Sequence, residues 1–210
     1  YILAVENSPA NLNNLVKVSA NAASQEPTKL YMQVGDSFKM KDLLYSLMLG
    51  SHNDTAVAIA EHISGSTTKF ANKMNTKAKQ IGCSSTHFVT PNGLDNGLNH
   101  YTTAYDLAKI ARYAWRNARL FQKVVGTPSY SFRSTQGRSY TTYTTNALLT
   151  TMPGVKGMKT GYTNKAGYCF AGVIRAKSGK TYISVTLGAS SSTARWNDSR
   201  TLLSYAYNNL

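Results

Sequence analysis

The sequence predicts an α+β fold, in which a helical lobe is followed by an antiparallel sheet with a C-terminal helix packed on it. Apolar residues recur at helical spacing over about 38–125, and beyond about 126 the pattern changes to the alternation typical of strands. No internal repeat or low-complexity linker interrupts the 210 residues, so we expect one domain over 1–210 whose two lobes meet near residue 125. A functional site is expected in the cleft between the lobes.

The helical lobe is expected to contain four helices, over residues 41–49, 55–63, 67–81 and 102–114. Gly50 and Gly82 stand where helices commonly stop. Thr102 or Thr103 is a plausible cap for the last of these helices. The intervening stretch 84–100 is expected to be a loop with a turn at Pro91-Asn92-Gly93.

The second half alternates as strands do. Residues 129–134 and 139–145 flank a Gln136-Gly137 turn, and residues 167–175 and 180–187 flank Ser178-Gly179, which predicts two hairpins. A final helix is predicted over 198–207.

The chain is strongly basic, with 23 Lys and Arg against 9 Asp and Glu and a net charge of +14. Such a charge favours anionic surfaces or polymers, although a general basic bias is an equally good explanation. The basic residues are scattered and no nucleic-acid motif is present, so nucleic acid is not expected as a partner. An anionic wall polymer or an acidic membrane surface fits better.

Two short motifs carry the chemical information. Ser51-His52-Asn53 stands between two apolar helices, and Lys159-Thr160-Gly161 precedes a hairpin, where it would lie on an edge strand. Either motif alone is weak evidence, because both occur by chance in surface turns. Their order and context indicate a cleft that could hold an extended peptide by strand addition.

Ser-x-Asn followed by Lys-Thr-Gly is typical of serine enzymes that act on D-alanyl peptides and β-lactams. The chain resembles the serine D-alanyl-D-alanine carboxypeptidases, the low-molecular-mass penicillin-binding proteins, over essentially its whole length. The stretches that carry this resemblance are 51–66, 90–95, 100–107, 155–168 and 202–205. The resemblance implies a penicillin-binding/β-lactamase-like fold.

The family's first motif, Ser-x-x-Lys, supplies the nucleophile, and residues 1–50 contain no such tetrad. We expect it two to three helical turns ahead of Tyr1, which would make this chain a catalytic domain without its nucleophile segment. Ser66-Thr67-Thr68-Lys69 fits the pattern literally but follows Ser51. A helix of about ten residues would hold the two serines roughly 15 Å apart, too far for proton transfer. Ser66 is therefore expected to be a helix N-cap.

The resemblance implies a catalytic set of Ser51, Asn53 and Lys159 and a substrate-binding set of Thr160, Gly161, Tyr162 and Arg195. In these roles Ser51 lies on the proton path to the leaving amine, and Asn53 orients the substrate amide and the missing lysine. Lys159 supplies positive potential. Thr160 donates a hydroxyl to the substrate's carboxylate, and the backbone N–H of Tyr162 is an oxyanion donor. Arg195 is expected to hold the same carboxylate, with a solvated arginine as the alternative.

His52 departs from the family pattern, which often has Gly or Asp at this position. We expect a solvated or capping histidine here, with a general-base role left open. The other histidines, His62, His87 and His100, show no metal-ligand spacing, so neither a metal site nor a cofactor is expected.

The resemblance implies a penicillin-sensitive D,D-carboxypeptidase. It would remove the terminal D-alanine of peptidoglycan stem peptides through an acyl-enzyme, outside the cytoplasm of a bacterium, in the cell wall or at the outer face of the membrane. β-Lactams would be inhibitors. One alternative is a β-lactamase of the related fold, but class A enzymes need a glutamate between the motifs and no Glu follows Glu61. Another is a non-catalytic wall-binding homologue, which the lack of Ser-x-x-Lys supports.

Overall fold

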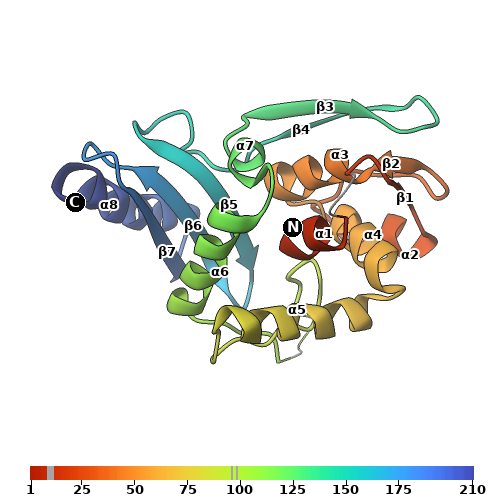
Figure 1. Ribbon diagram of the computed structural model, residues 1–210, viewed down its shortest axis with the longest axis horizontal. Coiled ribbons are helices and arrows are strands. Elements are labelled where there is room, and N and C mark those ends of the chain that lie inside the picture. The colour runs from red at the N-terminus through yellow and green to blue at the C-terminus, as the bar shows by residue number, and fades with distance from the viewer. Residues whose placement is uncertain (9–11, 96, 98) are drawn as a thin grey trace.

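The structure is a computed structural model that describes residues 1–8, 12–95, 97 and 99–210. Most helices gather at one end of the molecule, and a sheet backed by the C-terminal helix forms the other end (Figure 1). This arrangement confirms the predicted α+β fold. The elements, in chain order, are α1 (Ile2–Asn7), β1 (Leu15–Lys17), α2 (Ala20–Ala23), β2 (Ser37–Lys39), α3 (Met40–Tyr45), the π-helical turn η1 (Ser46–Gly50), α4 (Asn53–Ser64), α5 (Thr67–Ile81), α6 (Ala104–Asn117), α7 (Phe121–Val125), β3 (Ser129–Arg133), β4 (Ser139–Tyr143), β5 (Val155–Thr163), β6 (Gly167–Arg175), β7 (Thr181–Ala189) and α8 (Ser192–Asn209).

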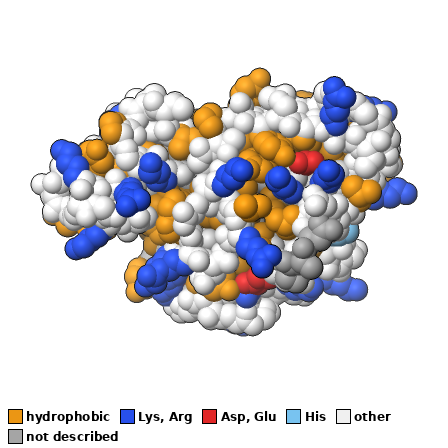
Figure 2. Space-filling view, turned by 45° about the horizontal axis from the view of Figure 1, so that its top comes forward, with side chains coloured by type: hydrophobic (Ala, Val, Ile, Leu, Met, Phe, Trp, Pro, Cys, Tyr) orange, Lys and Arg blue, Asp and Glu red, His pale blue; other side chains and the backbone are white. Residues whose placement is uncertain are grey.

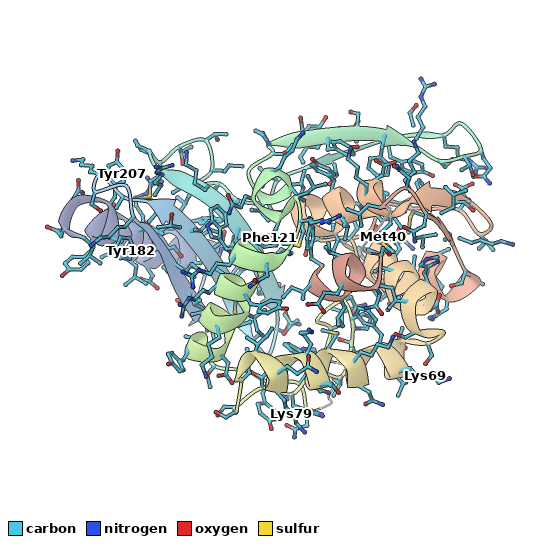
Figure 3. The ribbon with its side chains drawn as sticks, viewed as in Figure 1. Met40, Lys69, Lys79, Phe121, Tyr182 and Tyr207 are labelled. Carbon is cyan, nitrogen blue, oxygen red and sulfur yellow. The ribbon has the colours of Figure 1, made fainter. Side chains whose placement is uncertain are left out.

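Helices α4 and α5 show why the helical lobe forms. Residues 53–60 of α4 are all buried, so this helix runs through the lobe. Helix α5 is amphipathic: Phe70 faces inward, whereas Lys69 and Lys79 point away from the body of the molecule (Figure 3). The helix begins after the N-cap Ser66 and ends at Gly82, whose φ of 89° suits glycine.

The hairpin β3–β4 is a two-stranded sheet of its own, separate from the sheet of β5, β6 and β7. It lies along one side of the helical lobe, over α3 and β2 (Figure 1). Its Phe132 packs against Phe38 at a ring distance of 6.0 Å, and the hydroxyl of Tyr130 donates to Asp42 at 2.8 Å. The change from helices to strands near residue 125 therefore does not coincide with a change of core, since this hairpin shares the core of the helices before it.

The three-stranded sheet has the order β5-β6-β7, with antiparallel neighbours throughout. Helix α8 covers one face, where Leu203 packs against Phe170 and Ile174. Helix α6 covers the other face, where Ala111 lies in one cluster with Val173. Because β5 is the first strand in the order β5-β6-β7, it stands at a sheet edge, and it carries the predicted Lys-Thr-Gly motif there.

Helix α8 begins earlier than the predicted 198, because the hydroxyl of Ser191 accepts the backbone N–H of Ala194 and caps the helix at Ser192. Arg195 thus stands in its first turn. Sequence patterns also missed the short elements β1, β2, α2 and α7, which have three to five residues each and no long periodic run. Among the described residues, no helix has both the length and the apolar character that crossing a membrane requires.

Candidate functional site

The Ser51-His52-Asn53 turn joins η1 to α4. Ser51 ends η1 in the left-handed conformation, with φ 60° and ψ 36°, which is uncommon for a residue other than glycine. Asp54, fully buried in the first turn of α4, accepts the backbone N–H groups of Leu30 and Met32 at 3.0 and 3.2 Å. The turn is therefore anchored to the chain segment beside it.

Strand β5 brings the second motif to this turn. The ammonium of Lys159 donates to the Ser51 hydroxyl at 2.7 Å and to the carbonyl of Thr160, also at 2.7 Å. The Thr160 hydroxyl shares a hydrogen bond of 2.6 Å with Thr145, which follows β4. The structure thus brings Ser51, Lys159 and Thr160 together across 108 residues of sequence, at the junction of the two lobes.

Side chains alternate between the two faces of β5, and this determines which residues lie on the same face as Lys159. Lys159 and Gly161 share one face of β5, the face that Lys159 turns toward the helical lobe. A Cβ added to Gly161 would meet only the Cβ of Cys169, at 3.8 Å. Tyr162 lies on the opposite face, 52% exposed, with its ring 4.3 Å from that of Tyr168. Gly161 therefore leaves open space beside Lys159.

Lys159 has a pKa near enough to neutral pH that both its charged and its neutral form are accessible. Burial, together with the positive charge of Arg195, lowers the pKa of its ammonium to about 8. When charged, Lys159 holds Ser51 and Thr160 and has one donor left for an anion. When neutral, it can accept the proton of Ser51. The pair can therefore attract a carboxylate and move a proton.

Arg195 stands in the first turn of α8, near enough to Lys159 for its charge to lower the pKa of that ammonium. Its guanidinium carbon is 4.3 Å from the centre of the Trp196 ring and 5.5 Å from that of Tyr168, and one nitrogen donates to Ser192 at 3.2 Å. The side chain is 9% exposed, and its Nε is buried without a partner among the described residues. Arg195 is thus held between aromatic rings with donor capacity unused, which differs from a solvated surface arginine.

Two other candidates are placed differently. The amide nitrogen of Asn53 donates to the carbonyl of Glu26 at 2.9 Å, so this part of its side chain faces the 26–28 loop. Ser66 is the N-cap of α5, and its hydroxyl accepts the backbone N–H of Lys69 at 3.2 Å. This is the N-cap role that we expected for the serine of Ser66-Thr67-Thr68-Lys69. The twelve residues of α4 separate Ser66 from the Ser51 turn.

The expectation of a solvated or capping His52 was wrong. His52 stands at the N-cap position of α4, but its side chain makes no capping hydrogen bond. It is 9% exposed and its Nδ1 shares a hydrogen bond with Ser46 at 2.8 Å. No local sequence pattern marks Ser46 as its partner, because the two side chains meet only through the turn that Ser51 makes after η1. Thr145 was not predicted either, because it meets Thr160 only through tertiary packing.

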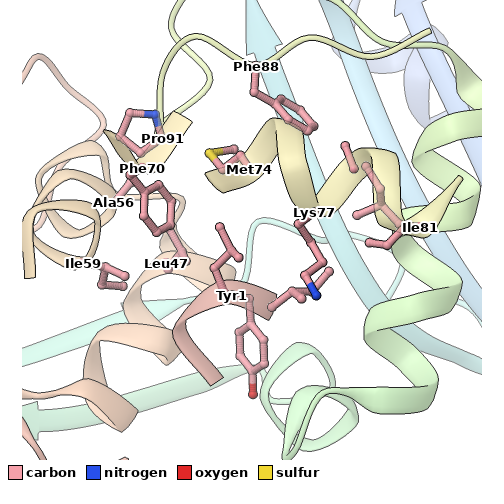
Figure 4. Close-up of a pocket in the computed structure, with 14 residues that line it drawn as sticks. Tyr1, Leu47, Ala56, Ile59, Phe70, Met74, Lys77, Ile81, Phe88 and Pro91 are labelled. Atoms are coloured by element: carbon pink, nitrogen blue, oxygen red, sulfur yellow. The ribbon is translucent and has the colours of Figure 1, made fainter. Parts of the chain in front are cut away.

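The apolar cavity of the helical lobe is a separate feature. Its volume is about 170 Å³, and its lining includes Ile59 of α4, Phe70 and Met74 of α5, and Phe88 of the segment after α5 (Figure 4). Lys77 reaches its wall, but the ammonium is paired with Glu6 at 2.8 Å. None of the motif residues lines it. The chemistry therefore belongs to the Ser51–Lys159 junction.

Comparison with known proteins gives consistent matches. The family model described as D-alanyl-D-alanine carboxypeptidase matches residues 2–191. The chain is 33% identical to D-alanyl-D-alanine carboxypeptidase DacF of Bacillus subtilis over 204 residues, which is 97% of this chain and 52% of DacF. It is 35% identical to the D-alanyl-D-alanine carboxypeptidase of Streptomyces sp. strain K15, covering 94% of this chain and 73% of that protein.

Solved structures agree with these matches. The crystal structure of D-alanyl-D-alanine carboxypeptidase DacD from Francisella tularensis superposes with a TM-score of 0.89 at 29% identity, covering 97% of this chain and 62% of that one. The Streptomyces K15 DD-transpeptidase superposes with a TM-score of 0.87 at 32% identity, covering 98% and 85%. The chain thus spans about half the length of DacF and most of the length of the K15 protein.

Proposed function

The chain belongs to the D-alanyl-D-alanine carboxypeptidase family, and we propose that it contains the substrate-binding and proton-transfer part of a serine D,D-carboxypeptidase site. The substrate is the stem peptide of peptidoglycan, and the reaction removes its terminal D-alanine through an acyl-enzyme. The observation that carries this proposal is the 2.7 Å contact between Lys159 on an edge strand and Ser51 in the opposing turn. It joins the two family motifs in one place.

The peptide binds as an added strand along the free edge of β5. Its terminal carboxylate takes the spare donors of Lys159 and Arg195 and the hydroxyl of Thr160. The backbone N–H of Tyr162 points to the carbonyl oxygen that becomes negative during attack. Gly161 keeps the path along the strand free of a side chain. Asn53 orients the substrate amide from the turn that its own amide nitrogen ties to Glu26.

In the acylation step a serine hydroxyl adds to the carbonyl carbon of the penultimate residue, and the bond to the terminal D-alanine breaks. The leaving amine needs a proton, and Ser51 with Lys159 lies on its path. Water then cleaves the acyl-enzyme ester. In this proposal the nucleophile is the serine of a Ser-x-x-Lys tetrad ahead of Tyr1.

Mapping the adduct formed with penicillin tests this assignment of roles. The full-length protein, incubated with penicillin, is expected to gain one penicillin mass, located by peptide mass spectrometry on a serine of a Ser-x-x-Lys tetrad. An adduct on Ser51 would make Ser51 and Lys159 a nucleophile–base pair, and our relay role for Ser51 would be wrong. An adduct on Ser66 would refute the N-cap interpretation of that residue. A protein with an intact tetrad and no adduct would contradict the enzyme function.

The cellular location that we propose for this protein follows from the proposed substrate. Peptidoglycan is assembled outside the cytoplasm, so we place the enzyme in the cell wall or at the outer face of the cytoplasmic membrane. β-Lactams are inhibitors, because they acylate the same serine. The charge of +14 supports association with an anionic wall polymer or membrane surface. Lys and Arg side chains spread over the whole face shown in Figure 2, with few acidic ones among them.

A further inference from the structure

The middle residue of the first motif, His52, is bonded inward. Its Nδ1 shares a hydrogen bond with the hydroxyl of Ser46 at 2.8 Å, and Ser46 shares a second hydrogen bond with Thr55 at 2.7 Å. Ser46 and Thr55 are both fully buried. The chain of three side chains therefore links the first residue of η1, the motif turn and the first turn of α4.

The conformation of Ser51 requires such a link. A residue other than glycine in the left-handed region costs roughly 1–3 kcal/mol and persists only where its surroundings impose it. Ser51 lies between Gly50 and His52. A Cβ on Gly50 would overlap the His52 imidazole and would lie 2.6 Å from the Thr142 hydroxyl. The Cε1 and Nε2 atoms of the ring are thus packed against the glycine, so both neighbours of Ser51 are held in place.

We propose that His52 is the positioning residue of the motif turn: its imidazole, hydrogen bonded to Ser46 and packed on Gly50, holds Ser51 in the left-handed conformation from which the hydroxyl meets Lys159. The value of that hydroxyl to the reaction rests on the function proposed above. The positioning itself rests on the contacts of His52 alone. His52 is not a catalytic residue in this account, because it reaches the substrate only through Ser51.

The groups around the ring favour its neutral form. Burial lowers the pKa of His52, Asp54 on α4 opposes this shift, and the ammonium of Lys159 on β5 adds to it. The hydroxyl of Thr142 on β4, beside the ring at Gly50, is buried without a partner among the described residues. A neutral ring uses one nitrogen on Ser46 and leaves the other facing this side, and it adds no positive charge to those of Lys159 and Arg195.

The test compares acylation by penicillin in the full-length protein and its variants. His52→Ala and Ser46→Ala are each expected to lower the first-order acylation constant roughly ten- to hundredfold, since a displacement of about 1 Å costs this much. The double variant should be no slower than either single variant, because both break one link. His52→Asn, whose amide can replace Nδ1, should restore most of the rate. The matched control is His62→Ala, an exposed histidine, which should leave acylation unchanged.

A second measurement needs no activity. In protein labelled with ¹³C at serine, the Cα and Cβ shifts of Ser51 report its backbone conformation. They are expected to move away from left-handed values in His52→Ala and to stay in His52→Asn. Unchanged shifts in His52→Ala, or equal loss of acylation in His52→Ala and His52→Asn, would overturn the positioning role. A wild-type protein that fails to acylate would refute the proposed function instead, and the shifts would still decide the role of His52.

Discussion

Lys159 is the side chain on which the proposed chemistry depends most. Its ammonium is held by a hydroxyl and a carbonyl, and within the described part of the chain no acidic residue is hydrogen bonded to it. Burial and the nearby Arg195 therefore act on it without a compensating carboxylate, and its pKa falls to about 8. This arrangement leaves the positive potential available to an anionic substrate, which would itself supply the missing negative charge.

Binding of free-carboxylate peptides should weaken above pH 8. As Lys159 loses its proton, a charge-assisted hydrogen bond worth about 1.5–3 kcal/mol is lost, so KM should rise roughly ten- to hundredfold by pH 10. Lys159→Arg, which keeps its charge, should flatten this dependence, whereas Lys156→Ala on the same strand should keep it. A wild-type KM that is constant from pH 7 to 10 would contradict the role given to Lys159.

The stability of the protein should respond to pH in the same window. The folded pKa of Lys159 is about 8 and the ordinary value is 10.5, so the unfolded chain binds more protons between these values. The contribution of Lys159 to the free energy of unfolding is therefore expected to increase as the pH rises from 8 to 10.5. The wild type should lose less stability on this side than Lys159→Arg does, as measured by urea unfolding.

Arg195 gives a second prediction at the residue scale. Arg195→Ala should lower kcat/KM for D-Ala-D-Ala peptides roughly ten- to hundredfold, because one charge-assisted hydrogen bond to the carboxylate is lost. A peptide whose terminal carboxylate is blocked as an amide should lose much less of its kcat/KM, because it never used this contact. Arg200→Ala, an exposed arginine of the same helix, is the control. Equal losses of kcat/KM for both substrates, or no loss for either, would contradict carboxylate binding by Arg195. Its role would then be to pack against Trp196 and Tyr168.

At the scale of elements, strand β5 and the motif turn form the site, and the sequence was informative about each of them separately. The hairpin predicted after Lys159-Thr160-Gly161 indicated an edge strand, and the strand order β5-β6-β7 places β5 at the edge. The bounds of α5 were predicted because Ser66 and Gly82 are local signals. The inward turn of His52 and the contact of Thr145 with Thr160 depend on long-range packing, which no local pattern encodes.

Gly161 tests the open edge of β5. Gly161→Ala should leave the melting temperature nearly unchanged, because the added methyl would meet only Cys169, at an ordinary contact distance of 3.8 Å. The methyl would stand beside Lys159, next to the edge of β5 where the peptide is proposed to bind, so acylation by penicillin should fall. Gly50→Ala is the contrasting variant, since its methyl overlaps His52 and should lower stability itself. Unchanged acylation in a stably folded Gly161→Ala would place the peptide elsewhere.

At the scale of the whole molecule, two cores meet at the site. The hairpin β3–β4 packs with the helices, and the sheet packs between α6 and α8, so the Ser51–Lys159 contact joins the two bodies. The whole chain carries a net charge of +14. Binding to an anionic polymer such as a teichoic acid should therefore weaken steeply as salt increases from 50 to 500 mM, while acylation by penicillin stays constant. Salt-independent polymer binding would contradict this electrostatic account.

The most direct test of the central claim, that Ser51 and Lys159 belong to a penicillin-reactive D,D-peptidase site, is the rate at which fluorescent penicillin labels the full-length protein and three variants. Labelling should slow at least tenfold in Ser51→Ala and in Lys159→Ala, because each removes one side of the 2.7 Å contact. Lys156→Ala, an exposed lysine on the same strand, should label like the wild type. If Ser51→Ala and Lys159→Ala both labelled at the wild-type rate, the junction of the two motifs would not be the active site.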